Sequence, residues 1–212
     1  MASGDAHVSQ CQKPRRWLGR VLLWRMNAGH SRLTDWGLAH VKIEKQHTIL
    51  DVGCGGGRTV SKLAAMAVEG KVYGVDYSEE SVAATGRINA RAIESGRGEV
   101  HHGSVSELPF ADGMFDLVTA VETHFWWRSL PSGMREIFRV LKTGGQLIII
   151  AEVYKGAITT GARLAEKYAA RTGMKFLSVD EHRELFTNAG YSDVQVTDKP
   201  DKAWICGVGR KP

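Results

Sequence analysis

The sequence is poor in proline, in cysteine and in long apolar runs, and each shortage excludes a class of protein. Only 5 of its 212 residues are proline and 24% are charged, which does not fit a disordered or collagen-like chain. The three cysteines, Cys11, Cys54 and Cys206, are widely spaced and odd in number, which argues against a disulfide scaffold or a zinc ribbon. The longest strongly aliphatic stretch, residues 147–151, is far shorter than the roughly 20 residues that cross a bilayer. We therefore expect a soluble, cytoplasmic protein.

The positive charge is concentrated at one end of the chain. Residues 1–46 contain eight lysines and arginines against three acids, whereas residues 47–212 contain twenty of each. Four apolar residues of the basic segment recur at helical spacing: Trp17, Leu18, Val21 and Leu22. Ser31 can cap a second helix that turns Leu33 and Trp36 inward. We predict a basic helical lid over residues 1–46 and one α/β domain over residues 47–212.

From residue 48 onward, short β-type runs alternate with amphipathic helical stretches. The predicted strands are 48–52, 71–75, 99–102, 115–121 and 146–152, and helices are expected around 58–68, 79–95, 131–141 and 180–189. Strands separated by helices imply a parallel sheet with right-handed crossovers. Two further runs, 191–197 and 203–209, are joined by a short polar turn and must pair antiparallel at one edge. The sequence therefore predicts an open α/β sheet.

The strongest functional signal is the turn after the first predicted strand, Asp51-Val-Gly53-Cys54-Gly55-Gly-Gly. Glycines at this place let the backbone approach a ligand closely, and the helix that follows exposes unpaired N–H groups. The dinucleotide fingerprint G-x-G-x-x-G is not met, because Arg58 or Val60 stands where the third glycine should be. Acids follow both of the first two strands: Asp51 lies within the turn and Asp76 ends the next strand. They suit a ligand that carries an ammonium group, a sulfonium and a ribose.

These residues resemble the class I S-adenosylmethionine-dependent methyltransferases, and three further motifs extend the resemblance over most of residues 47–209. The motifs are Glu107-Leu-Pro-Phe-x-Asp112-x-x-Phe115-Asp116, Arg135-Glu-x-x-Arg139-Val-Leu-Lys-x-Gly144-Gly145 and Glu184-Leu-Phe-x-x-Ala189-Gly190-Tyr191. The subgroup is similar to the small-molecule enzymes of the ubiquinone/menaquinone-biosynthesis type. The resemblance implies a Rossmann-like sheet of seven strands in the order 3-2-1-4-5-7-6, with strand 7 antiparallel and helices on both faces.

The resemblance also implies how the glycine turn would hold S-adenosylmethionine. Gly53 and Gly55 would lie under the methionine part of the cofactor. Asp51 and the backbone at Cys54 would lie near its amino end.

The remaining cofactor residues come from the tips of later strands. Asp76 would bind the ribose hydroxyls, and Tyr77 would cover one face of the adenine. The family often has Gly-Asp-Ala after its third strand, where this chain has Gly103 followed by Ser104 and Val105. A serine hydroxyl can accept from the adenine amino group, but it is a weaker acceptor than a carboxylate. Glu122, just past the fourth strand, would face the methionine moiety or the methyl acceptor.

Methyl transfer is an in-line displacement, so the protein must align the acceptor, exclude water and remove a proton where the nucleophile carries one. Our candidate for a general base is His124, which follows the fourth strand and has a side chain that is neutral near pH 7. The alternative is a histidine packed under Trp126 and Trp127 or simply lining the pocket. We expect no metal site, since successive strand residues such as His101 and His102 point to opposite faces.

The acceptor itself is not encoded in any motif, and neither is the oligomeric state. We expect a small-molecule acceptor and no nucleic acid, because residues 47–212 are neutral overall. The basic N-terminal helix could have one of three roles: it could form a lid over the cofactor, bind an anionic acceptor, or dock to a membrane surface. Two other functions stay open at this point: a non-catalytic module with the same fold, favoured only by Ser104, and an NAD-dependent oxidoreductase.

Overall fold

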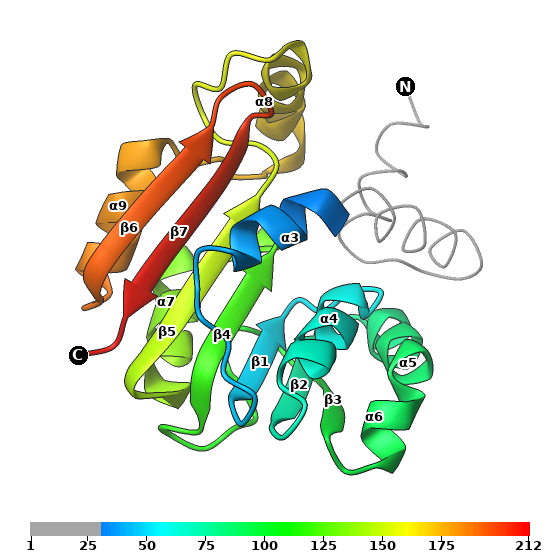
Figure 1. Ribbon diagram of the computed structural model, residues 1–212. Helices are drawn as coiled ribbons and strands as arrows, with labels where there is room; N and C mark the ends of the chain where they lie inside the picture. The colour runs from blue at the N-terminus through cyan, green and yellow to red at the C-terminus, as the bar shows by residue number, and fades with distance from the viewer. Residues whose placement is uncertain (1–30) are drawn as a thin grey trace.

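One sheet of seven strands organises the protein, and the computed structural model describes residues 31–212, except for the side chains of residues 170–172 (Figure 1). The strands are β1 (Thr48–Val52), β2 (Lys71–Asp76), β3 (Gly98–His102), β4 (Phe115–Val121), β5 (Leu141–Ala151), β6 (Ser192–Lys199) and β7 (Trp204–Arg210). Their order is β3-β2-β1-β4-β5-β7-β6, and β7 runs antiparallel to both of its neighbours. The predicted order and the antiparallel seventh strand are confirmed.

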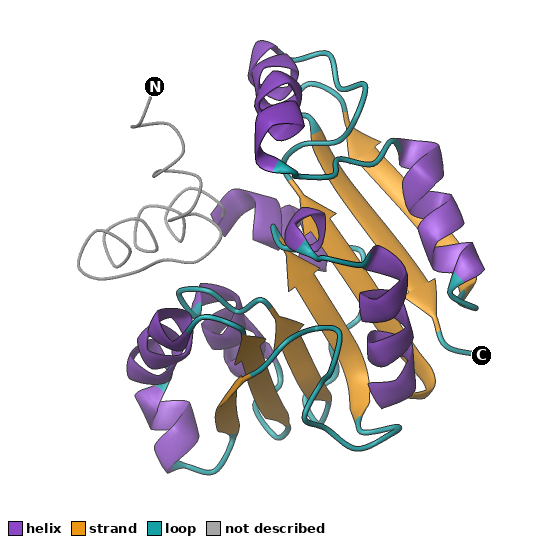
Figure 2. Cartoon of the chain, turned by 180° about the vertical axis from the view of Figure 1, so that it is seen from behind, coloured by secondary structure: helices purple, strands orange, loops and turns teal. Residues whose placement is uncertain are grey.

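Helices cover both faces of this sheet. They are α3 (Ser31–Leu38), α4 (Arg58–Met66), α5 (Glu79–Ile88), α6 (Ala90–Glu94), α7 (Leu130–Val140), α8 (Thr160–Thr172) and α9 (Val179–Asn188), with a short 3-10 helix, η1 (His124–Trp126). Helices α3, α4 and α5 lie on the face towards the viewer in Figure 1, and α7 and α9 lie on the opposite face, which Figure 2 brings to the front. The predicted α/β architecture with helices on both faces is therefore confirmed.

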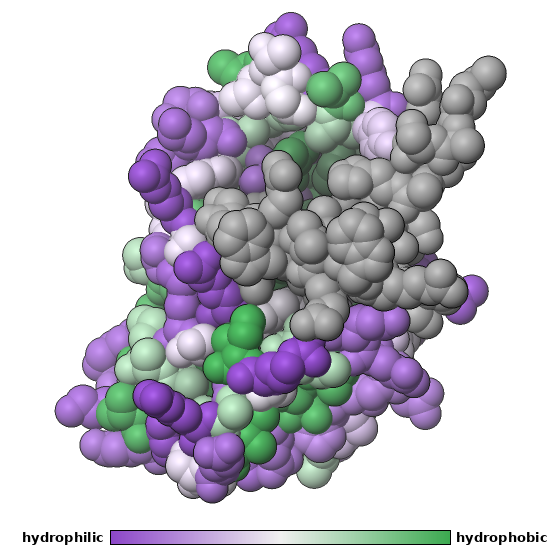
Figure 3. All heavy atoms as spheres, turned by 90° about the vertical axis from the view of Figure 1, so that its right-hand side faces the viewer, coloured by the Kyte–Doolittle hydropathy of each residue, from purple (hydrophilic) through white to green (hydrophobic). Residues whose placement is uncertain are grey.

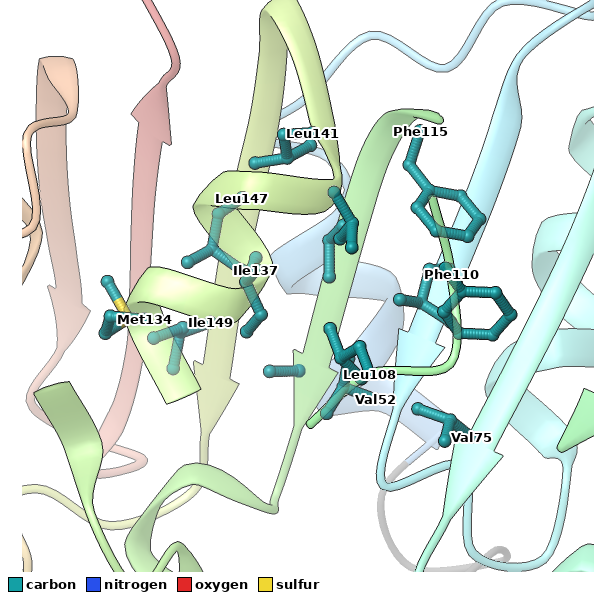
Figure 4. Packing of buried hydrophobic residues seen from close by; sticks show 14 of the residues in the cluster. Val52, Val75, Leu108, Phe110, Phe115, Met134, Ile137, Leu141, Leu147 and Ile149 are labelled. Carbon is teal, nitrogen blue, oxygen red and sulfur yellow. The ribbon is translucent and has the colours of Figure 1, made fainter. Parts of the chain in front are cut away.

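Alternating strand residues supply two separate cores. Leu50 of β1 is fully buried in the cluster that contains residues of α7 and α9, whereas its neighbour Ile49 is fully buried in the cluster that contains residues of α3 and α4. Figure 4 shows the first core, where Met134 and Ile137 of α7 pack towards Ile149 of β5. Each such side chain contributes roughly 1.5–3 kcal/mol when it is fully buried. On the part of the face that Figure 3 colours, hydrophobic residues are interspersed among hydrophilic ones.

Beyond shifts of one or two residues at element ends, the structure differs from the sequence prediction in three places. The stretch 79–95 forms two helices, because the side chain of Asn89 turns back and donates to the carbonyls of Thr85 (2.9 Å) and Gly57 (3.0 Å). Helix α8 was not predicted, and neither was the early start of β5, which begins directly after α7 and runs through Gly144.

Helix α3 is the described part of the predicted N-terminal lid, and it packs on the sheet. Leu33 is buried and Trp36 packs against the same core, as expected. A methyl group at Gly37 would lie 2.5 Å from Cγ1 of Ile150, so only glycine lets α3 approach β5 this closely. The predicted helix around Trp17 lies outside the described residues. No helix among residues 31–212 has the length and apolarity needed to span a membrane.

Candidate active site

A cavity of about 580 Å³ opens at the carboxyl ends of β1, β2 and β4. Its lining residues are Val52, Gly53, Val75, Asp76, Tyr77, Gly103, Ser104, Val105, Ser106, Thr123, Trp126, Trp127 and Arg128. Open parallel sheets bind their ligands at this end of the strands. Five residues predicted for the cofactor line it: Gly53, Asp76, Tyr77, Ser104 and Val105. Asp51, Cys54, Gly55 and Glu122 lie on the same strand tips and turn but are not among the lining residues.

The glycine turn after β1 is held tightly against its neighbours. The amides of Gly53 and Cys54 both donate to the carbonyl of Val75, at 2.7 and 3.1 Å. Gly53 has a φ of 71°, and a methyl group there would lie 2.3 Å from Oγ1 of Thr123. The turn therefore requires glycine for its backbone conformation and for its contact with the segment after β4. A ligand at this place meets bare backbone.

Asp76 is fixed in orientation at the edge of the cavity. Its Oδ2 accepts from the amide of Gly55 at 2.9 Å, and its Oδ1 accepts from the amide of Ser78 at 2.9 Å. Burial raises the pKa of this carboxyl, although both hydrogen bonds oppose the shift. The β1 turn and the start of α5 thus hold one carboxylate where a ligand can reach it.

Asp51 is the more deeply buried of the two acids. Only 2% of it is exposed, and it accepts from Oγ1 of Thr119 at 2.6 Å. Burial raises the pKa of Asp51 to about 7, and the nearby charge of Asp76 adds to the shift. No lysine or arginine whose side chain is described, in residues 31–169 and 173–212, forms an ion pair with either acid. The site therefore contains buried negative charge without a matching side-chain cation.

Cys54 and Gly55 complete the turn from its buried side. The Cys54 thiol lies 3.5 Å from Oγ1 of Thr85 and would touch any side chain added at Gly74. Burial raises the pKa of the thiol far above its ordinary range, so it stays protonated. The Cys54 side chain therefore packs the turn against β2 and α5.

Tyr77, Ser104 and Glu122 stand at three other strand tips. Tyr77 is 40% exposed, and burial of its hydroxyl raises its pKa to about 12. The hydroxyl of Ser104 accepts from the amide of Ser106 at 3.2 Å. Glu122 has a φ of 57°, unusual for a residue with a side chain, and its carboxylate accepts from the amide of Glu152. That bond ties the tip of β4 to the tip of β5.

Residues 123–128 form a wall of the cavity. The sequence makes Trp126 and Trp127 candidates for an aromatic acceptor pocket, with core or lid packing as the alternative, whereas it does not predict Thr123 and Arg128 there. Thr123, Trp126, Trp127 and Arg128 line it. Positions three apart in a 3-10 turn lie on the same side, and the bond from the Trp126 amide to the Thr123 carbonyl (2.9 Å) closes this turn. The spacing of Thr123 and Trp126 could have indicated this wall if a helical turn had been expected there.

The same turn places the predicted general base, His124, elsewhere. His124 is 1% exposed, it is not among the residues that line the cavity, and its Nε2 lies 3.1 Å from Nε2 of His182 on α9. Nδ1 of His182 faces the carbonyl of Ser178 at 2.8 Å. That nitrogen must donate, so Nε2 of His182 accepts and Nε2 of His124 donates. Nδ1 of His124 has no hydrogen-bond partner.

Burial lowers the pKa of both histidines, and most strongly that of His124. The pair is therefore neutral at pH 7. In the part of the chain that the structure describes, no group of three histidine, cysteine or acidic side chains could hold a metal ion.

The comparisons with known proteins agree with one another. Residues 50–149 match the family described as a methyltransferase domain. The chain is 25% identical over 193 residues to the uncharacterized methyltransferase YdaC of Bacillus subtilis (strain 168), covering 88% of this chain and 96% of that protein. It is 31% identical over 191 residues to the demethylmenaquinone methyltransferase of Geobacillus kaustophilus (strain HTA426), and the match covers 79% of this chain and 80% of that protein. Its fold is similar to that of a SAM-dependent methyltransferase from Aquifex aeolicus, with a TM-score of 0.73 and 19% identity. The match covers 91% of this chain and 98% of that protein.

Proposed function

The chain belongs to the methyltransferase-domain family, and on that premise we propose that its cavity binds S-adenosylmethionine beside a small-molecule methyl acceptor. The resemblance to class I methyltransferases and the assignment as an S-adenosylmethionine-dependent enzyme are confirmed by these relatives. The proposal concerns which residues do the work.

The observation that carries the proposal is the pair of buried acids. Asp51 and Asp76 are 2% and 7% exposed, and neither pairs with any lysine or arginine side chain that the structure describes. Both acids accept hydrogen bonds, but burying a carboxylate without a paired cation is costly. The ammonium and sulfonium of the cofactor would supply the positive charge that the protein does not. The two carboxylates of this site therefore match the positive charges of the cofactor.

Each residue of the crevice then has a definable task. Gly53 provides a floor without a side chain, and Asp76 accepts hydrogen bonds from the ribose hydroxyls. The carboxylate of Asp51 attracts the ammonium group of the cofactor. Tyr77 covers the adenine, and Ser104 with Val105 borders its far side. Glu122 stands at the β4 tip, where the donor and the acceptor would meet, and the backbone amides at Cys54 and Gly55 complete the turn.

When bound, S-adenosylmethionine supplies an electrophilic methyl group, so the task of the protein is alignment and exclusion of water. The indoles of Trp126 and Trp127 form an apolar wall that serves both purposes. We propose that His124 acts on this wall as a positioning residue: it fixes η1 to α9 through His182 and does not remove the proton itself.

We also propose that the acceptor is not a nucleic acid. Residues 47–212 carry twenty basic and twenty acidic side chains, so this domain has no net positive charge to attract a phosphate backbone. Docking of the basic segment 1–46 to an anionic membrane surface stays a proposal, and binding of the full chain to anionic against neutral vesicles would test it.

Titration calorimetry tests the cofactor site. We expect S-adenosylmethionine and its demethylated product to bind and NAD not to bind. Binding of NAD alone would overturn the proposal, and binding of none of the three would favour a non-catalytic module.

A further inference from the structure

One wall of the cavity carries a cation that the proposed cofactor site does not use. Arg128 is the only lysine or arginine among the described residues that line the cavity, and Asp76 is the only acid. Arg128 is exposed, and no acidic side chain that the structure describes forms an ion pair with it. Since Asp76 is assigned to the ribose, Arg128 is the charge left for a second ligand.

Two indoles lie beside this cation and offer flat apolar surface. Trp127 is fixed: its Nε1 donates to Oγ1 of Thr123 at 3.4 Å, and its ring lies so close to Gly133 that a methyl group there would be 2.7 Å away. Trp126 is half-buried, with its ring centroid 5.7 Å from that of Phe125. A planar ligand can lie against such surfaces with little loss of side-chain entropy, because the indoles are already held.

The start of α7 adds to the positive potential around Arg128. Ser129 is the N-cap of this 11-residue helix, and its hydroxyl accepts from the amide of Ser132 at 3.3 Å. Arg128 directly precedes that cap. The positive end of the helix dipole therefore reinforces the guanidinium charge.

We propose that this wall is the acceptor subsite and that it selects a planar, conjugated acceptor carrying an anionic group such as a carboxylate. Arg128 is the specificity-determining residue, and Trp126 and Trp127 bind the ring. The inference rests on the proposed function, because it takes the wall at Asp76 and Gly53 to belong to the cofactor. Arg128 favours a planar anion for a geometric reason: a guanidinium pairs with a carboxylate through two parallel hydrogen bonds.

The test uses two probes that differ in charge and little in shape, naphthoate and naphthamide. Each is titrated by calorimetry into the full chain saturated with S-adenosylhomocysteine. We expect naphthoate to bind at least about tenfold more tightly than naphthamide, because only naphthoate forms a charge-assisted hydrogen bond with Arg128. The substitution Arg128→Gln should abolish that preference and leave the affinity for naphthamide unchanged. Arg135→Gln, which removes an equal charge from α7 outside the cavity, should keep the preference.

Three results would overturn the inference: equal binding of the two probes, a preference that survives Arg128→Gln, or no binding of naphthoate at millimolar concentration. Failure of the proposed function would look different. It would appear earlier, as an absence of S-adenosylhomocysteine binding by the unmodified protein, whereas the outcomes above all presuppose that this compound binds.

Discussion

The buried carboxyl of Asp51 should make the folded protein lose stability as the pH rises, and Asp51→Asn should remove that loss. Burial raises the pKa of Asp51 from its ordinary value of 3.8 to about 7 in the folded protein. Between these two values the unfolded chain has released the proton while the folded chain still holds it. Stability is therefore fully present below pH 4 and falls until the pH passes about 7.

The magnitude follows from the interval of about three pH units. At 1.36 kcal/mol per unit, the Asp51 proton accounts for about 4 kcal/mol of unfolding free energy. For a domain of this size 1 kcal/mol corresponds to roughly 2–4 °C in Tm, so the wild-type Tm should fall by roughly 10 °C over this range because of Asp51. Asparagine keeps the hydrogen bond from Thr119 but does not titrate. The Tm of Asp51→Asn should therefore not show this fall with rising pH.

Thermal unfolding between pH 4.5 and 8, without ligand, provides the measurement. The variant also buries an amide, which adds a cost that does not depend on pH, so the slope is diagnostic and the absolute Tm is not. Asp201→Asn, on the exposed β6–β7 turn, is the matched control and should follow the wild type. Parallel curves for Asp51→Asn and the wild type would refute the reasoning that burial raises the pKa of Asp51 in the folded protein.

Three further substitutions probe the same site. Asp76→Asn should weaken S-adenosylmethionine binding at least about tenfold in calorimetry, because a charge-assisted hydrogen bond contributes about 1.5–3 kcal/mol; an unchanged Kd would contradict the ribose role. Gly53→Ala should lower Tm and cofactor affinity together, since the left-handed backbone costs roughly 1–2 kcal/mol and the methyl group would meet Thr123. Its control, Gly86→Ala within α5, has no atom within 4 Å of the added methyl group and should raise Tm slightly. His124→Ala should lower the unfolding free energy by at least about 1–3 kcal/mol, because it leaves a buried acceptor on His182 without its donor. If His124 is instead the general base, methyl transfer would be abolished while Tm and cofactor affinity stayed unchanged.

The sheet was predictable because its signals are local. Strands β1 and β2 are short apolar runs that are each followed by a helix, and the bounds of β1 and β4 agree with the prediction residue for residue. Glycines with positive φ mark the β1 turn, so the crevice could be placed from the sequence as well. Five of the predicted cofactor residues line the cavity for this reason.

What the sequence could not provide depends on contacts between distant segments. The two histidines of the buried pair are 58 residues apart, and no spacing rule connects them. The turn at residues 123–127 is set by its packing between Gly53, Gly133 and α9, so its direction could not be read from Thr-His-Phe-Trp-Trp alone. The position of His124 outside the cavity lining follows from that direction.

A single hydroxyl joins the two halves of the cavity. Oγ1 of Thr123 lies against the bare backbone of Gly53 and also accepts from the indole of Trp127. The turn proposed to hold the methyl donor and the ring proposed to bind its recipient therefore share one side chain, so a substitution at Thr123 would alter the surroundings of both.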